Sequence, residues 1–137
     1  MGNDIHISKL TLLIAKKLID NAEKTALKIN VPVTISIVDE SGNVIALHKM
    51  DNSILISIKA SISKAYTSLA LKTSTQKLQE LVKPDADFYT LQNIRNSNLC
   101  FMSGGIPIEI NGKVIGAIGV SGGTKEEDIR IAESAFR

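Results

Sequence analysis

The glycine-rich stretch from Phe101 to Gly123 constrains the fold of this chain more than any other segment. Within it, Ile106–Ile110 and Lys113–Val120 are predicted strands, and Asn111-Gly112 between them is a strong signal for a tight hairpin turn. The second of these strands is apolar without alternation, which is typical of a strand buried on both faces. Such a strand needs helices above and below the sheet, so this segment predicts a three-layer arrangement.

The remainder of the chain supplies the other layers. Apolar residues at helical spacing predict a long amphipathic helix from Lys9 to about Asn30, with Ser8 as its N-cap. Turn residues at 40–43 separate two more predicted strands, which form another hairpin. The strands of that hairpin are Val33–Asp39 and Val44–Met50, and the other predicted elements are helices at Ile54–Leu71, at Ser74–Val82 and from Thr124 onward, and a strand at Leu99–Met102.

Strands joined as hairpins form an antiparallel sheet, and the order of the elements gives that sheet five strands. We therefore expect an α+β fold of three layers, α/β/α, in which residues 1–137 form a single domain of ordinary size. Gly116 and Gly119 lack side chains inside the last strand, so something packs close to it. That neighbour is either a helix backbone or a flat ligand, and we favour the helix.

Composition and charge exclude several kinds of partner. The formal charge is +2, no basic cluster is present and aromatic residues make up only 4%, so we expect no nucleic-acid partner. No apolar run approaches the roughly 20 residues that cross a bilayer, and we expect no membrane partner. The first nine residues lack a secretory pattern, and a single cysteine, Cys100, excludes an internal disulfide. These features fit a cytoplasmic location.

The segment Gly119–Gly123 matches the pattern G-x-S-x-G between a strand and a helix, which is the context of a hydrolase nucleophile. A hydrolase of that kind needs a histidine later in the chain than its serine. Both histidines of this sequence, His6 and His48, precede Ser121. We therefore interpret Ser121 as a turn residue near a pocket rather than as a nucleophile.

Polar groups around the last helix leave an enzymatic alternative open. The predicted helix start at 124–127 presents unpaired N–H groups, and the glycines before it would let a carboxylate or phosphate approach. Glu126, Glu127 and Asp128 complement the same helix dipole, which is the competing structural explanation. Lys64, Ser121 and Asp128 are the candidate polar groups for a reaction on a small organic acid, but no pair among them has a spacing that demands chemistry.

The two histidines are the candidate metal ligands. His48 lies at the end of a predicted strand, where it is either an ordinary polar residue on the surface or a ligand for a metal or for haem iron. His6 lies in the N-terminal segment and could swing over a ligand or over a second copy. Met50 and Met102 are possible thioether ligands, although methionines are more often core residues.

Several blocks of this sequence resemble the GlcG/HbpS family, which also includes the C-terminal domain of PduO-type corrinoid adenosyltransferases. A V-D-x-x-G-N hairpin, a K/R-M-D block, a K-A pair, an F-x-x-G-G-x-P-I block and a V-I-G-A-I-G-V-S-G strand occur in the family's order. They are Val38–Val44, Lys49–Asp51, Lys64-Ala65, Phe101–Ile108 and Val114–Gly122, with Asp128 and Ala132 following in the last helix. Lys49 departs from the family's arginine and loses a bidentate fork.

The resemblance implies a profilin-like (GlcG-like) fold with a five-stranded antiparallel sheet, homo-oligomers built from dimers, and haem or a related tetrapyrrole as ligand in some members. We therefore predict a haem-binding or corrinoid-binding domain, accessory rather than catalytic, with the small-molecule ligand in a shallow apolar site near Phe101–Pro107. An enzyme acting on haem or on a small organic acid is one alternative. An oligomeric assembly domain of a metabolic complex or microcompartment is another. The candidate ligand-binding residues are His48, His6, Lys64, Phe101, Met102, Gly104, Gly105, Pro107, Ser121 and Gly122, with His48 as the metal ligand.

Overall fold

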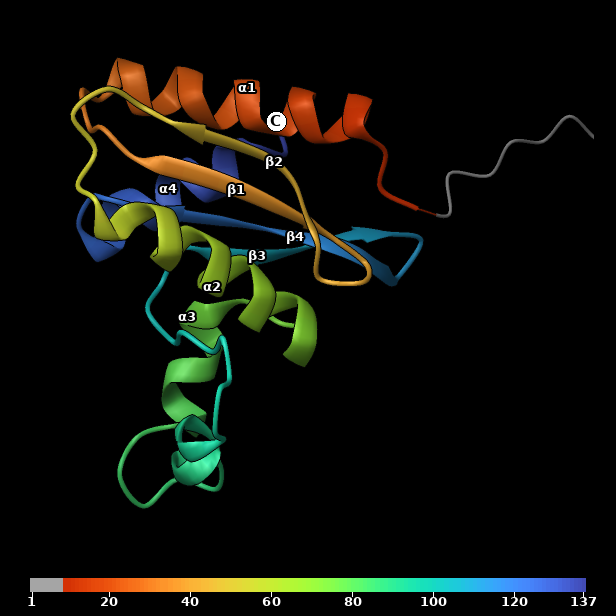
Figure 1. Ribbon diagram of the computed structural model, residues 1–137, viewed down its shortest axis with the longest axis vertical. Coiled ribbons are helices and arrows are strands. Elements are labelled where there is room, and N and C mark those ends of the chain that lie inside the picture. Colours follow the sequence, from red (N-terminus) through yellow and green to blue (C-terminus); the bar gives the residue numbers. More distant parts are fainter. Residues whose placement is uncertain (1–8) are drawn as a thin grey trace, which may run out of the picture.

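A computed structural model describes residues 9–137 of the protein as a twisted antiparallel sheet between helices (Figure 1). The helices α1 and α4 contact each other on one face of the sheet, and α2 covers the other face. The elements in chain order are α1 (Leu12–Lys28), β1 (Thr34–Asp39), β2 (Val44–Lys49), α2 (Ile56–Leu71), α3 (Thr75–Leu78), the 3₁₀ turns η1 (Gln79–Leu81) and η2 (Tyr89–Asn93), β3 (Gly105–Ile110), β4 (Lys113–Ser121) and α4 (Lys125–Ser134).

The sheet contains four strands in the described residues, in the order β2-β1-β4-β3, and every neighbouring pair is antiparallel. The α+β class and the antiparallel sheet between helical layers are therefore confirmed, but the prediction of five strands is wrong. Leu99–Met102 is not a strand because side chains take its backbone groups. The Cys100 N–H donates to Thr67 Oγ1 at 2.7 Å, and the Phe101 carbonyl accepts from Gln79 Nε2 at 3.1 Å.

Helix ends follow local capping chemistry. The first helix begins at Leu12 rather than at Lys9, because the side chain of Thr11 accepts a hydrogen bond from the Ile14 N–H at 3.2 Å. The predicted cap Ser8 lies outside the described residues. At α4 the predicted helix start at 124–127 is confirmed and carries a capping box: Thr124 accepts from the Glu127 N–H, and the Glu127 side chain accepts from the Thr124 N–H.

The two faces of the sheet differ in chemistry. Ile35, Ile37, Ile118 and Val120 lie in an apolar core shared with α1 and α4. The opposite face of the same central strands meets α2 through small polar side chains. The Ser36 and Ser61 hydroxyls, for example, lie 2.7 Å apart in a buried hydrogen bond. Hydroxyl pairs of this kind satisfy the buried polar atoms and let helix and sheet approach closely.

Gly119 marks the closest approach of β4 to α2. A Cβ atom at Gly119 would overlap the carbonyl oxygen of Ser61 and would lie 2.7 Å from the backbone nitrogen of Ala65. The neighbour of Gly119 is therefore the backbone of a helix, which is the alternative that we favoured from the sequence. A Cβ at Gly116 would instead lie 2.5 Å from the Val38 carbonyl oxygen of the adjacent strand β1 and 2.7 Å from Leu10.

Candidate functional site

A pocket of about 550 Å³ opens beside the edge strand β3, between α3 and α4. Its apolar wall comes from Ile106 and Pro107 of β3 and from Ile129 and Phe136 at the C-terminal helix. Two glycines, Gly104 and Gly105, also line it. The rest of the lining is polar or charged: Lys72, Thr73, Ser74, Gln76, Lys77, Glu109 and Glu133. We call this the β3-edge pocket. It holds three of the predicted ligand-binding residues, namely Gly104, Gly105 and Pro107.

The backbone of β3 keeps this edge of the sheet open. The Gly105 N–H donates to Thr75 Oγ1 at 2.9 Å, so this outward-facing donor is already satisfied. Pro107, the next residue to face outward, has no N–H to donate. A further strand therefore finds few donors along this edge, and the edge stays available for a ligand.

Two lysines give the β3-edge pocket its cationic side. Lys72 is the C-cap of α2 in a left-handed conformation, with φ of 57°, and Lys77 lies in α3. Both side chains are exposed. An apolar wall beside two exposed cations suits a flat apolar ligand that carries carboxylates. Neither lysine was predicted from the sequence, because nothing in their local pattern distinguishes them from other surface lysines.

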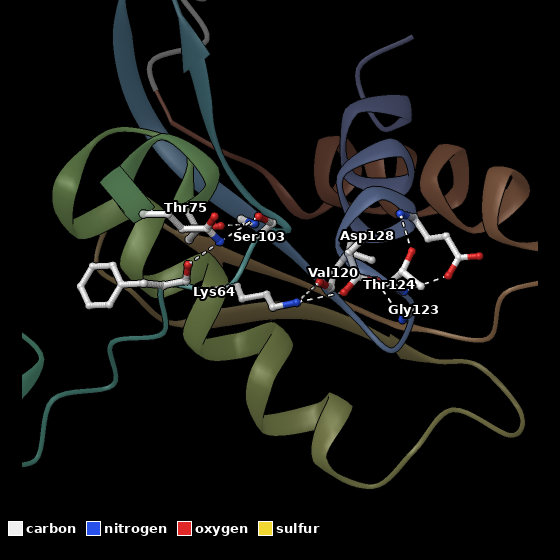
Figure 2. A network of polar contacts seen from close by, with 11 residues as sticks. Lys64, Thr75, Ser103, Val120, Gly123, Thr124 and Asp128 are labelled. Carbon is white, nitrogen blue, oxygen red and sulfur yellow. Dashed lines mark hydrogen bonds and ion pairs between the residues drawn. The ribbon is translucent and has the colours of Figure 1, made fainter. Parts of the chain in front are cut away.

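Behind the pocket lies a buried ion pair that joins α2 to α4 (Figure 2). Lys64 Nζ donates to Asp128 Oδ2 at 3.0 Å and to the Val120 carbonyl at 2.8 Å. Asp128 Oδ1 accepts from the Gly123 N–H at 2.9 Å. The two side chains are only 1% and 5% exposed. Lys64 thus supplies a hydrogen-bond donor for the carbonyl of Val120 near the end of β4. Val120 is next in sequence to Gly119, which pairs with the first residue of β3.

Burial raises the pKa of the Asp128 carboxyl above its ordinary value. The attraction of the Lys64 ammonium and the hydrogen bonds from the Gly123 and Gly122 backbone oppose this effect without cancelling it. Two of the three Lys64 donors and both Asp128 oxygens have protein partners, and both side chains are buried, so neither is exposed to a ligand in this conformation.

The remaining predicted residues of this region divide into two groups. Ser121 and Gly122 end β4 behind the pocket, where Ser121 is buried and a Cβ at Gly122 would lie 2.7 Å from the Pro32 carbonyl. Phe101 and Met102 lie on the segment that leads to the pocket, and Met102 is 63% exposed. Gln79, which the sequence analysis did not single out, bonds this segment to η1 through Ser103 Oγ at 2.9 Å.

The predicted anion site at the start of α4 is occupied by the protein's own side chains. Glu127 accepts from the Thr124 N–H at 2.8 Å, and Asp128 accepts from the Gly123 N–H. These carboxylates already take two of the donors that an external carboxylate or phosphate would use, the N–H groups of Gly123 and Thr124. The helix start thus gives little support to the enzymatic alternative.

His48 lies on β2, at the opposite edge of the sheet from the β3-edge pocket. Its Nδ1 is 2.8 Å from Oε1 of Glu23 on α1. A second pocket of about 440 Å³, lined partly by Glu23 and Met50, lies nearby. Within one chain, His48 and the three pocket residues Gly104, Gly105 and Pro107 therefore lie at opposite edges of the sheet. His6 lies outside the described residues.

Residues 9–137 contain no group of three or more His, Cys, Asp and Glu side chains arranged to hold a metal ion. Over the same range, no helix has both the length and the apolar character that a membrane span requires.

Comparisons with known proteins agree with this architecture. Residues 10–137 match the family model described as haem degrading protein HbpS-like. The chain is 42% identical to an uncharacterised 15.0 kDa protein from the dhaT-dhaS intergenic region of Citrobacter freundii, over 99% of this chain and 96% of that protein. A solved structure of a PduOC:heme complex is 33% identical and superposes with a TM-score of 0.89, covering 93% of this chain and 92% of that one.

The corrinoid adenosyltransferase PduO of Salmonella typhimurium is 35% identical over 115 residues. These residues are 84% of this chain but 34% of PduO, so the chain spans about a third of that enzyme. The family model covers nearly all of the described residues, and the relatives share both sequence and fold with them. The chain therefore belongs to the HbpS-like family.

Proposed function

We propose that this protein binds haem or a related tetrapyrrole, such as a corrinoid, in the β3-edge pocket. The observation that carries the proposal is the pairing of an apolar wall with two lysines at a sheet edge that has few free donors. The similarity to the PduOC:heme complex supports the same ligand class. The volume of about 550 Å³ lies within the ordinary range of small-molecule pockets, which is about 300–1,000 Å³.

The residues fit the chemistry of such a ligand. A tetrapyrrole presents a broad apolar ring, which would lie against Ile106, Pro107 and Phe136. Its carboxylate side chains would pair with Lys72 and Lys77, which line the same pocket together with Glu109 and Glu133. Pairs of this kind at an exposed rim contribute about 1 kcal/mol or less each, so ring burial supplies most of the affinity.

An accessory binding role is favoured over catalysis. The polar groups that could have served a reaction, Lys64 and Asp128, are committed to each other and to the backbone. The alternative, an enzyme that acts on haem, takes its support from the description of the family as haem degrading. Turnover of bound haem by the purified protein, seen as loss of its absorbance with a reductant and oxygen, would favour that alternative.

We also propose that the protein forms homo-oligomers. Three consecutive apolar side chains at the start of α2, Ile54, Leu55 and Ile56, are 58%, 82% and 60% exposed. Leu13 on α1 is 78% exposed. Consecutive exposed apolar residues usually mark a contact surface. An assembly role in a metabolic complex would use the same surfaces.

The binding site can be tested by titrating hemin into the wild-type protein and into the double variant Lys72→Gln/Lys77→Gln. We expect a saturable change of the Soret band in the wild type. In the double variant we expect the dissociation constant to rise about tenfold, the effect of losing two ion pairs of somewhat under 1 kcal/mol each.

The matched control is Lys16→Gln/Lys17→Gln, which removes the same charge from exposed positions on α1 that line none of the pockets described above. The control should bind hemin as the wild type does. An equal rise of the dissociation constant in both double variants would show that hemin affinity responds to net charge alone. That result would contradict binding in the β3-edge pocket.

A further inference from the structure

The hydrogen bonding between β3 and β4 is incomplete at Gly104, the residue just before β3 begins. Gly105 pairs with Gly119, so the register places Gly104 opposite Val120. The Val120 N–H donates to the Gly104 carbonyl at 2.9 Å, which makes this a pair of the type that normally exchanges two hydrogen bonds. In the described chain the return bond, from the Gly104 N–H to the Val120 carbonyl, is not made.

The Lys64 ammonium takes the place of that N–H. It donates to the Val120 carbonyl at 2.8 Å and to Asp128 Oδ2 at 3.0 Å (Figure 2). Gly104 has a φ of 127°, which turns the peptide before it out of the plane of the sheet. Only glycine adopts this conformation readily, and a Cβ at Gly104 would overlap the Val120 carbonyl oxygen. The lysine and the glycine together therefore keep the Gly104 N–H out of the ladder.

The N–H that is left over belongs to a residue that lines the β3-edge pocket. No acceptor bonds to the Gly104 N–H among residues 9–137, although Gly104 is buried. A buried backbone donor without a partner costs about as much as a lost hydrogen bond, and native proteins leave very few of them. The adjacent Gly105 N–H, by contrast, already donates to Thr75 Oγ1 at 2.9 Å. A molecule in the pocket can thus supply the acceptor that Gly104 lacks.

We propose that the Gly104 N–H is the donor that orients a carboxylate of the tetrapyrrole in the β3-edge pocket, and that Lys64 positions this donor by occupying the Val120 carbonyl. The inference rests on the proposed function and deepens it. Lys72 and Lys77 attract the same carboxylates as flexible point charges, whereas a backbone N–H fixes the direction of the bond. A hydrogen bond from a backbone N–H to a carboxylate is also charge-assisted, and such bonds are the stronger ones.

The donor is tested by following the amide protons of Gly104 and Gly105 by NMR while zinc protoporphyrin, a diamagnetic tetrapyrrole with two carboxylates, is added. In the free protein the Gly104 amide should exchange with solvent faster than the Gly105 amide, because only the latter has a partner. On binding, the Gly104 proton should shift downfield and its exchange should slow, while Gly105 stays unchanged as the internal control. The dimethyl ester of the same porphyrin should shift Gly104 far less. Equal shifts with the acid and the ester would overturn carboxylate recognition.

The positioning role of Lys64 is tested with the double variant Lys64→Met/Asp128→Asn, which removes both charges and frees the Val120 carbonyl. The Gly104 N–H should then bond to that carbonyl, so its exchange should be slow before any ligand is added. The dissociation constant for zinc protoporphyrin should rise about tenfold, as expected for the loss of one hydrogen bond to a charged group. A double variant that binds as the wild type does, with a Gly104 amide that still exchanges fast, would overturn the positioning role.

The matched control on the same helix is Ser57→Ala. Ser57 shares a buried hydrogen bond of 2.7 Å with Thr34, so its loss also weakens the contact between α2 and the sheet. The substitution leaves Lys64 and Gly104 in place, and the affinity for zinc protoporphyrin should equal that of the wild type. An equal loss of affinity in Ser57→Ala and in the double variant would mean that general loosening of α2, and not the freed N–H, sets the affinity.

The outcomes separate this inference from the proposed function. If the wild type binds zinc protoporphyrin and the Gly104 amide does not respond, this inference fails and the proposed function stands. If the wild type binds no tetrapyrrole, both fail. The measurements on the wild-type protein decide between these results even if the double variant does not fold. A Gly104 amide that responds to the acid, together with weaker binding in the double variant alone, supports both.

Discussion

Replacing Lys64 by methionine should lower the free energy of unfolding by about 3–5 kcal/mol at neutral pH, because it leaves a buried carboxylate without its counter-ion. Methionine is similar in length, so the change removes the ammonium with little loss of volume. Asp128, 4% exposed, would keep only its backbone donors, and the Val120 carbonyl would lose its partner. Urea unfolding followed by circular dichroism measures the difference.

The pH dependence of Lys64→Met has a definite sign. Burial already raises the pKa of Asp128 in the wild type, and loss of the ammonium raises it further. A carboxyl whose pKa is higher in the folded state holds its proton to a higher pH there, so stability falls as the pH rises from about 4. The deficit of Lys64→Met relative to wild type should therefore shrink on acidification.

The control for this prediction is the double variant Lys64→Met/Asp128→Asn, which removes both charges. It should be more stable at neutral pH than Lys64→Met and should lose the pH dependence. A Lys64→Met protein with wild-type stability at neutral pH would mean that the ion pair does not hold α2 against α4.

Gly119→Ala should be the most damaging of the simple glycine substitutions, with a loss of about 3 kcal/mol in the free energy of unfolding. The added methyl would overlap the Ser61 carbonyl and approach the Ala65 nitrogen. Both neighbours are backbone atoms of α2, so no rotamer change can make room. Thermal or urea unfolding of the purified variant measures the loss.

Gly112→Ala is the matched control. A Cβ at Gly112 meets nothing within 4 Å, so it adds no clash, although its φ of 78° makes alanine unfavourable by about 1–2 kcal/mol. The difference between the two variants isolates the cost of pushing α2 away from the sheet. Equal losses would show that helix contact at Gly119 is not what selects glycine there.

Local signals in the sequence were sufficient for much of the fold. The Asn111-Gly112 turn predicts the β3–β4 hairpin, and Thr124 with Glu127 predicts the start of α4. These signals work because neighbouring residues decide the turn or the cap. The prediction of a strand at Leu99–Met102 was wrong for the opposite reason. Its apolar pattern fits a strand, but the side chains of Thr67 and Gln79, which are distant in sequence, take its backbone groups.

The candidate site was only partly predictable. Gly104, Gly105 and Pro107 were singled out by their motif and do line a pocket, whereas Lys72, Lys77 and Phe136 join them only once the chain is folded. Lys64 and Asp128 were each noted as polar candidates, but nothing in the sequence shows that residues 64 positions apart form one ion pair. Contacts between distant elements carry no local signal.

A crystal structure of the protein grown with hemin would show whether a tetrapyrrole lies in the β3-edge pocket. Iron gives an anomalous scattering peak that locates the ring independently of the fitted coordinates. We expect this peak beside Pro107, with carboxylates near Lys72 and Lys77. An iron peak at a site away from β3 would contradict binding in this pocket. So would crystals that were grown with stoichiometric hemin but contain no hemin on the protein.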